Sequence, residues 1–217
     1  MLSGDFAAKE VAKLEPPKLA AMEAHYQTGT GVPLVIGGIP DDATGKVKYA
    51  LQIPYGLSML IGYNPATKVI GLDDFPRDQW PNVRLVHWSF DIMVGAGSAM
   101  LAVAVWVIWV WWRTRRLPDN KWLLRALVGC SPFGFIALET GWFVTELGRQ
   151  PWIIYGLMRT KDAVTPMPGL VVPFTTFTIV YLLLAVIVIF LLRRQFMETH
   201  PHWIKKETIK EEPVSHA

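Results

Sequence analysis

The hydrophobic and polar positions divide the chain into one polar segment, residues 1–85, followed by three long apolar runs. The runs cover residues 86–112, 122–147 and 170–192. A helix that crosses a bilayer needs about 20 predominantly apolar residues, and each run reaches that length. The pattern therefore predicts an all-α membrane protein with three transmembrane helices behind a polar loop region.

Within the polar segment, turn-forming residues separate short elements. Pro16 and Pro17 precede good helix formers and predict a short helix over residues 17–26. Glycine- and proline-rich turns flank a short strand at residues 34–36. Residues 49–61 are too few to cross a bilayer, so we expect an extended piece and a short helix there. Charged side chains throughout the first 30 residues argue against a signal peptide or an anchor.

Basic residues indicate the orientation of the predicted helices. They gather in the loop at residues 113–121 and in the tail at residues 193–217. Loops rich in lysine and arginine remain on the cytoplasmic side, so we expect both segments to be cytoplasmic. The loop at residues 148–169 and the polar segment, residues 1–85, then lie outside the cytoplasm.

The composition supports a membrane protein and narrows its partners. Hydrophobic residues make up 52% of the chain and charged residues only 18%, which is too apolar for an ordinary soluble domain. The single cysteine, Cys130, excludes a disulfide framework and a cysteine-rich metal site. The net charge is only +3 and the basic residues lie beside apolar runs, so we expect membrane lipid and no nucleic acid as a partner.

Carboxylates inside the apolar runs are the first candidate chemistry. Asp91, Glu139 and Glu146 need a protein interior, a cofactor or a water-filled path, because a bare charge in a bilayer is costly. Glu139, Trp142 and Glu146 are spaced i, i+3 and i+7 and share one face of the second helix. This face is a candidate site. The alternative is a structural network in which Glu139 or Glu146 pairs with Arg149.

Met93 is a candidate cofactor ligand in the first helix, about 10 Å inside its outer boundary at 1.5 Å per residue. Gly95 and Gly97 follow it and would allow a flat macrocycle to approach the thioether, and methionine is an axial ligand of haem iron. The alternative is a packing methionine beside a glycine-mediated helix contact. Spacing alone favours the packing alternative.

Three stretches resemble subunit I of cytochrome bd, the bacterial quinol oxidase. Residues 141–152 are similar to the signature of that family, residues 18–23 to its quinol-loop motif, and residues 88–94 to the helix that carries a haem ligand. They occur in the same order along the chain. The resemblance covers residues 1–195 but only the C-terminal half of the subunit, so we expect a fragment or a split half that is inactive alone.

The resemblance implies a role for individual residues. Met93 matches an axial ligand of a low-spin haem b, and Glu146 matches the glutamate that ligates a high-spin haem b. Lys18 and Glu23 match residues that bind and oxidise quinol. Trp142 matches a tryptophan close to the haems.

Two other residues belong to the implied cofactor region. Arg149 lies where a guanidinium could stabilise haem propionates or the Glu146 carboxylate. Glu139 shares the face of Glu146 and is assigned to the same cofactor region.

The implied activity is oxidation of a membrane quinol, with electrons passing through the two b haems to haem d or a third haem b, where dioxygen is reduced to water. Glu23 would act as a general base, and Lys18 would orient the quinol oxygen. Without the family match, this pair is typical of a solvated charged helix. The implied partners are the N-terminal half of subunit I and subunit II, in the bacterial cytoplasmic membrane.

Two features depart from the family pattern. Asp91 stands where better-known members carry an arginine, so haem potentials do not transfer from them. The histidines that complete the low-spin haem and ligate haem d in the family belong to its N-terminal half, outside the region of resemblance. His87 is six residues from Met93 and faces another way, so we do not expect it to bind the same iron. The rival class is a non-catalytic membrane scaffold or assembly remnant without haem. A transporter is less favoured because the third helix has no polar face.

Overall fold

The computed structural model describes residues 2–116, 120–164 and 166–210, and the chain divides into two units. The first unit is Met1–Val164 and the second is Thr165–Ala217. Within the described residues, three helices are long and apolar enough to cross a membrane. The predicted fold class, a helical membrane protein with three transmembrane helices, is confirmed.

The first transmembrane helix is α4, Val83–Thr114, which starts before the apolar run that begins at residue 86. Asn82 caps this helix, because its side chain accepts a 3.1 Å hydrogen bond from the Leu85 N–H. The helix ends at Arg115, which has a left-handed backbone with φ of 52°. A helix cap is polar, so hydropathy alone places the start of this helix too late.

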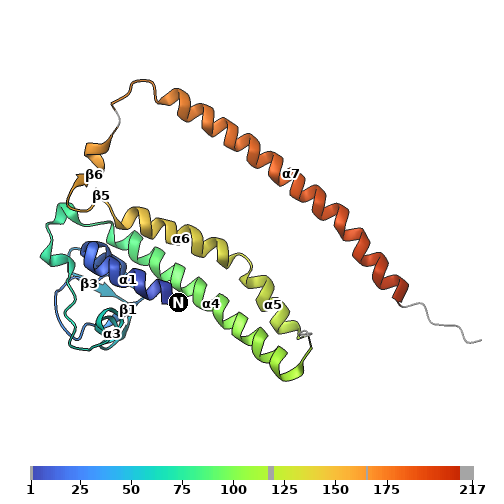
Figure 1. Cartoon of the computed structure of the whole chain (residues 1–217), viewed down its shortest axis with the longest axis horizontal. Coiled ribbons are helices and arrows are strands. Elements are labelled where there is room, and N and C mark those ends of the chain that lie inside the picture. Colours follow the sequence, from blue (N-terminus) through green and yellow to red (C-terminus); the bar gives the residue numbers. More distant parts are fainter. Residues whose placement is uncertain (1, 117–119, 165, 211–217) are drawn as a thin grey trace, which may run out of the picture. The chain divides into compact units, whose positions relative to one another are not determined.

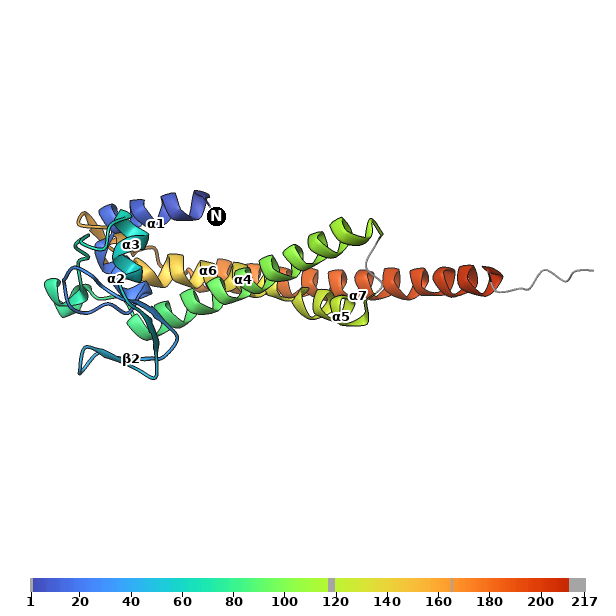
Figure 2. The ribbon, with the colours of Figure 1, turned by 90° about the horizontal axis from the view of Figure 1, so that it is seen from below.

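The second predicted helix consists of two helices, α5 (Lys121–Cys130) and α6 (Phe133–Gly148). Pro132 separates them, because proline lacks the N–H that a continuous helix would use and its ring clashes with the preceding turn. Helix α6 packs along α4, and α5 contacts the far end of α4. Both views show α4 and α6 side by side (Figure 1 and Figure 2).

The third transmembrane helix is α7, Val171–Lys210, in the second unit. It continues beyond residue 192, where the apolar run ends, so part of the predicted tail is helical. Arg194 and Glu198 form an i, i+4 ion pair of 2.7 Å in this continuation. The apolar run marks the part suited to hydrocarbon, whereas the helix itself depends on backbone hydrogen bonds.

Parts of four predicted segments fall outside the described residues. Residue 1 belongs to the predicted polar segment, residues 117–119 to the predicted inner loop, residue 165 to the predicted outer loop and residues 211–217 to the predicted tail.

Residues 2–82 fold into short helices and two-stranded sheets at one end of α4 (Figure 1). The elements are α1 Leu2–Leu14, α2 Pro16–Met22, β1 Leu34–Ile36, β2 Ile39–Asp41, β3 Lys46–Lys48, β4 Leu51–Ile53, α3 Gly56–Gly62 and the 3-10 helices η1 Leu72–Asp74 and η2 Arg77–Gln79. Strand β1 pairs with β4, and β2 with β3, both antiparallel. The loop after α6 contains β5 Trp152–Ile154, β6 Met158–Arg159 and the 3-10 helix η3 Thr160–Ala163.

Most short elements agree with their predictions. The strand at residues 34–36 is β1, and the stretch at residues 49–61 contains β4 and α3. The helix predicted over residues 17–26 is α2, and it ends at Met22 because the backbone turns at Ala24, where φ is 45°. Helix α1 was not predicted, since its charged residues conceal an apolar pattern.

The core of the first unit lies where the loop region meets α4 and α6. Helix α2 contributes a fully buried face to it, and α4 and α6 contribute the ends that adjoin the loop region. Its buried members include Ala20, Ala21, Met22, Leu72, Val83, Val86 and Val144. Apolar burial of this kind is the main force that stabilises a folded unit. The core therefore fixes α2 over the ends of two transmembrane helices.

Candidate functional site

Lys18 and Glu23 occupy the two ends of helix α2, and neither belongs to a solvated face. The Lys18 side chain is 13% exposed, and its Nζ lies 3.0 Å from Glu15 Oε2. Its aliphatic stem lies on α6, because a Cβ atom added at Gly148 would be 3.1 Å from Lys18 Cγ. Glu23 is only 2% exposed. The solvated-helix alternative is therefore wrong for this pair.

Glu23 is a buried carboxyl group with no hydrogen bond or ion pair to its side chain among the described residues. Burial and, to a smaller extent, the nearby Asp91 carboxylate together raise the pKa of Glu23 from 4.5 to about 8. Both causes disfavour the charged form. A carboxyl group with a pKa near neutral pH can accept and release a proton during a reaction.

The first turns of α4 hold the loop region by hydrogen bonds. His87 is fully buried between the Met22 and Gly37 backbone oxygens, and Asp91 accepts a 2.7 Å hydrogen bond from the Gly37 N–H. Trp88 Nε1 donates to the Gly38 oxygen at 2.8 Å. The partners that Asp91 needed are thus in the loop region. Sequence reasoning missed this junction, and its one local signal is a histidine and an aspartate spaced i, i+4.

Met93 lies in the contact between α4 and α6. A Cβ atom added at Gly141 would lie 3.1 Å from Met93 Sδ, so the thioether packs against this glycine. Gly95 and Gly97 face open space, since an added Cβ would meet no atom within 4 Å at either position. The structure thus combines a packing contact for the sulfur with an open surface on the same helix.

Glu139, Trp142 and Glu146 lie on α6 away from its buried residues Val144 and Gly148. Trp142 is 60% exposed, and the Glu146 side chain is 45% exposed. Glu139 has no hydrogen bond or ion pair within the described part of the chain. A candidate membrane helix therefore presents a tryptophan and two carboxylates on one exposed face, as the spacing predicted.

Arg149 pairs with Glu146, because its Nη2 lies 2.6 Å from Glu146 Oε1. This is the pairing anticipated in the structural alternative, while Glu139 takes no part in it. Met93 faces Gly141 in the helix contact, whereas Glu146 lies on the exposed side of α6. The structure does not bring the two candidate ligands together.

The described residues contain no group of three or more histidine, cysteine or acidic side chains that could hold a metal ion. Haem iron has a different requirement, since the macrocycle supplies four nitrogens and the protein supplies axial ligands. The Met93 thioether and the Glu146 carboxylate can each provide one axial ligand. The donor set therefore fits two separate haems with one ligand each from this chain.

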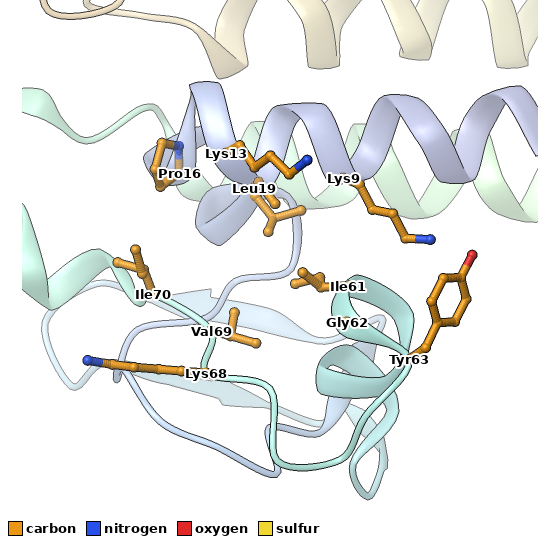
Figure 3. Close-up of a pocket in the computed structure, with 11 residues that line it drawn as sticks. Lys9, Lys13, Pro16, Leu19, Ile61, Gly62, Tyr63, Lys68, Val69 and Ile70 are labelled. Atoms are coloured by element: carbon orange, nitrogen blue, oxygen red, sulfur yellow. The ribbon is translucent and has the colours of Figure 1, made fainter.

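A separate cavity of about 350 Å³ lies beside α2, between α1 and the segment at residues 61–70. Figure 3 shows its apolar side chains and the lysines on two sides. Lys9, one of them, has its Nζ 3.5 Å from the centre of the Tyr63 ring. Neither Lys18 nor Glu23 lines this cavity. Sequence reasoning did not find it, because its walls come from distant segments.

Comparison with known proteins places these features in a family. A model of cytochrome bd terminal oxidase subunit I matches residues 1–200. A provisionally named cytochrome bd menaquinol oxidase subunit I of Bacillus subtilis (strain 168) is 40% identical over 202 residues, which are 92% of this chain and 45% of that protein. The cytochrome bd ubiquinol oxidase subunit 1 of the same strain is 31% identical over 214 residues, with 93% and 46% covered.

The bd oxidase structure from Geobacillus thermodenitrificans matches with a TM-score of 0.75 and 36% identity, over 91% of this chain and 45% of that chain. The chain thus spans less than half the length of the relatives it matches. Its three apolar helices and this likeness identify a bacterial membrane protein. With a family model that covers residues 1–200, the chain belongs to the cytochrome bd terminal oxidase subunit I family.

Proposed function

We propose that this chain is the C-terminal half of subunit I in a quinol:oxygen oxidoreductase of the cytochrome bd type. The observation that carries the proposal is the position of α2. This helix holds a buried carboxyl group, Glu23, which has no side-chain partner among the residues that the structure describes, directly over the ends of the two helices that carry Met93 and Glu146. The chain would serve aerobic respiration only as part of a complex.

Glu23 and Lys18 carry the proposed quinol chemistry. Oxidation of a quinol releases protons from its hydroxyl groups, and the buried Glu23 carboxylate would accept one as a general base. The Lys18 ammonium, held at 3.0 Å from Glu15, would orient the quinol oxygen and stabilise the developing anion. The names of the two Bacillus subtilis relatives mention menaquinol and ubiquinol, which supports a membrane quinol as the substrate class.

Met93 and Glu146 would hold the haems of this half, the first a low-spin haem b and the second a high-spin haem b. Bound haems supply one-electron transfer, and an additional haem d or third haem b supplies the iron at which dioxygen is reduced. Trp142 and Glu139 would line the Glu146 haem from the same face of α6. Arg149 would hold the Glu146 carboxylate in place or pair with a propionate.

The proposed partners complete both haem sites. The N-terminal half of subunit I would supply the axial ligands that this chain lacks, and subunit II would cover the remaining helix faces. Exposed apolar side chains along α4, α6 and α7 support such docking together with contact to lipid. Residues 1–85 and 148–169 would lie outside the bacterial cytoplasmic membrane, and the tail at residues 193–217 in the cytoplasm.

A reduced-minus-oxidised absorption spectrum tests this function. Membranes that contain the chain together with an N-terminal half and subunit II should show haem bands, and membranes with the chain alone should not. In the assembled complex, Met93→Ala should remove the low-spin haem band and Glu146→Ala the high-spin one. The proposal fails if both variants retain the full spectrum and normal quinol oxidation.

A haem-free scaffold is the second candidate, because one observation favours it. Both proposed ligands already have protein contacts: Met93 packs on Gly141, and Glu146 pairs with Arg149 at 2.6 Å. A scaffold would assemble with its partners without showing haem bands. The same spectrum therefore separates the two candidates.

A further inference from the structure

A histidine–aspartate pair joins α4 to two separate parts of the loop region. His87 Nδ1 lies 2.8 Å from the Met22 backbone oxygen. His87 Nε2 lies 3.1 Å from the Gly37 oxygen and 3.4 Å from Asp91 Oδ2. The same Asp91 oxygen accepts a 2.7 Å hydrogen bond from the Gly37 N–H. The end of α2 and the turn at Gly37 are thus both held by one turn of α4.

Each ring nitrogen of His87 lies within hydrogen-bond distance of a backbone oxygen. The number of hydrogen bonds that the ring donates therefore depends on which nitrogens carry a hydrogen. A neutral imidazole has a single N–H and donates to only one of the two backbone oxygens. Asp91 Oδ2 lies 3.4 Å from Nε2 and places a second acceptor on the Gly37 side of the ring. His87 is fully buried, so a lost hydrogen bond would not be replaced by bulk water.

The turn itself has no room for a side chain at Gly38, because it packs closely against the segment around β3. Gly38 has a φ of 95°, and a Cβ atom there would lie 2.8 Å from the Lys48 oxygen. A side chain is therefore excluded by both conformation and space. Trp88 Nε1 adds a 2.8 Å hydrogen bond to the Gly38 oxygen from the same helix. The turn has one defined position against α4.

We propose that His87 and Asp91 are positioning residues that clamp the Gly37–Gly38 turn and the end of α2 onto α4, and thereby fix the position of Glu23. The inference rests on the proposed role of Glu23 in quinol oxidation. Met22, whose carbonyl contacts His87, is the residue before Glu23 in the chain. A displaced Met22 carbonyl therefore moves the Glu23 backbone.

Positioning matters because a general base must lie within about 2.6–3.2 Å of the proton that it removes. A misplacement of about 1 Å can reduce a rate about a hundredfold. Glu23 has no hydrogen bond of its own within the described residues that would hold its carboxyl group. Its location therefore depends on the backbone of α2, which the clamp fixes.

Amide hydrogen exchange in the assembled complex tests the contact without using activity. His87→Leu removes both ring nitrogens that lie beside the Met22 and Gly37 oxygens, and Asp91→Ala removes the acceptor of the Gly37 N–H. In both variants the Gly37 amide should exchange at least tenfold faster than in the wild type. In His87→Leu the amides of Ala24 and His25, which hydrogen-bond to the carbonyls of Ala21 and Ala20 at the end of α2, should also exchange faster.

Kinetics in the same complex test positioning. His87→Leu should lower kcat/KM for quinol at least tenfold, while the haem spectrum and oxygen reduction with a small water-soluble electron donor remain within twofold of the wild type. His87→Gln keeps a donor near the position of Nε2 and His87→Asn keeps one near Nδ1, so each should restore part of the loss. Misfolding would instead lower both activities and the haem content together.

Ser58→Ala is the matched control. Ser58 is also fully buried in the loop region, and its hydroxyl binds the Val32 N–H and the Thr67 oxygen at 2.9 and 3.0 Å. Both of these partners lie in the loop region, away from the clamp, so Gly37 exchange and kcat/KM for quinol should stay within twofold of the wild type.

The outcomes separate the clamp from the proposed function. Unchanged Gly37 exchange in His87→Leu and Asp91→Ala overturns the clamp. Faster exchange with unchanged kcat/KM for quinol overturns its positioning role. A wild-type complex that contains haem but oxidises no quinol overturns the proposed function, and the exchange rates at Ala24 and His25 then decide alone whether the clamp holds the end of α2.

Discussion

A carboxyl group at the end of α2 sets the acid–base behaviour of the proposed quinol site. Glu23 is 2% exposed, and its pKa is raised to about 8, first by burial and second by Asp91. At pH 7 most of this group is therefore protonated, whereas a general base must be ionised. The residue is poised to change protonation state close to neutral pH.

Quinol oxidation by the assembled complex should therefore speed up as the pH rises. Below pH 8, kcat/KM should increase about tenfold per pH unit and then level off, since the ionised fraction of Glu23 follows its pKa of about 8. Glu23→Gln should remove this rise of kcat/KM with pH, and most of the activity. In Asp91→Asn the rise should occur at lower pH, because one cause of the raised pKa of Glu23 is gone. If the rise of kcat/KM with pH is unaffected by Glu23→Gln, it arises from the titration of another group.

The same pKa shift makes the stability of the loop region depend on pH. The folded form binds the Glu23 proton more tightly than the unfolded chain, so this contribution to the free energy of unfolding is complete below pH 4.5. It declines as the pH rises and is lost above about 8. Glu23→Gln should flatten this decline in thermal unfolding followed at several pH values. An equally steep decline in the variant would contradict the shift.

At the scale of elements, the contact between α4 and α6 places Met93. Helix α6 offers glycine at two positions that face methionines of α4. An added Cβ would lie 3.1 Å from Met93 Sδ at Gly141, but 3.9 Å from Met100 Sδ at Gly134. The first distance requires the sulfur to move and the second is an ordinary contact. Space at Gly141 therefore determines where the Met93 thioether can lie.

Gly141→Val should displace Met93 and weaken the low-spin haem band in the reduced-minus-oxidised spectrum of the assembled complex. Gly134→Val lies on the same helix and faces a methionine that has no proposed ligand role, so it serves as the matched control and should leave that band intact. Equal loss of the band in both variants would point to general damage to helix packing. An intact band in Gly141→Val would argue against Met93 as a ligand.

An element can be predicted from the sequence where neighbouring residues alone identify it. Three apolar runs predict the transmembrane helices, and glycine- and proline-rich turns predict β1. Helix α1 escapes prediction because its lysines and glutamates interrupt the apolar pattern. Pro132 was visible in the second run, but hydropathy averages over such a break, so the division into α5 and α6 was missed.

From residue spacing alone, the candidate site was predictable only where one helix carries it. Spacing placed Glu139, Trp142 and Glu146 on one face of α6, whereas the burial of Glu23 depends on segments brought together by the fold. The contacts between α4 and the Gly37–Gly38 turn join residues about fifty positions apart, His87 with Gly37 and Trp88 with Gly38. Periodicity carries no information on contacts between such distant segments.

At the scale of the whole molecule, the topology determines on which side of the membrane the proposed quinol site lies. The basic loop at residues 113–121 should be cytoplasmic, and residues 1–85 and 148–169 should lie on the opposite side. Glu23 and the clamp then lie at the outer surface. Protons released from quinol would leave on that side, so the orientation has a consequence for energy conservation.

Cysteine labelling in intact cells tests this orientation, because Cys130 is the only cysteine of the chain. In a Cys130→Ser background, Thr44→Cys and Asp162→Cys place a thiol at exposed positions of the two predicted outer segments, and Asn120→Cys places one in the predicted inner loop. A membrane-impermeant thiol reagent should label the first two and leave the third unlabelled until the cells are opened. The reverse pattern would place Glu23 on the cytoplasmic side, and protons from quinol would then be released and consumed on the same side of the membrane.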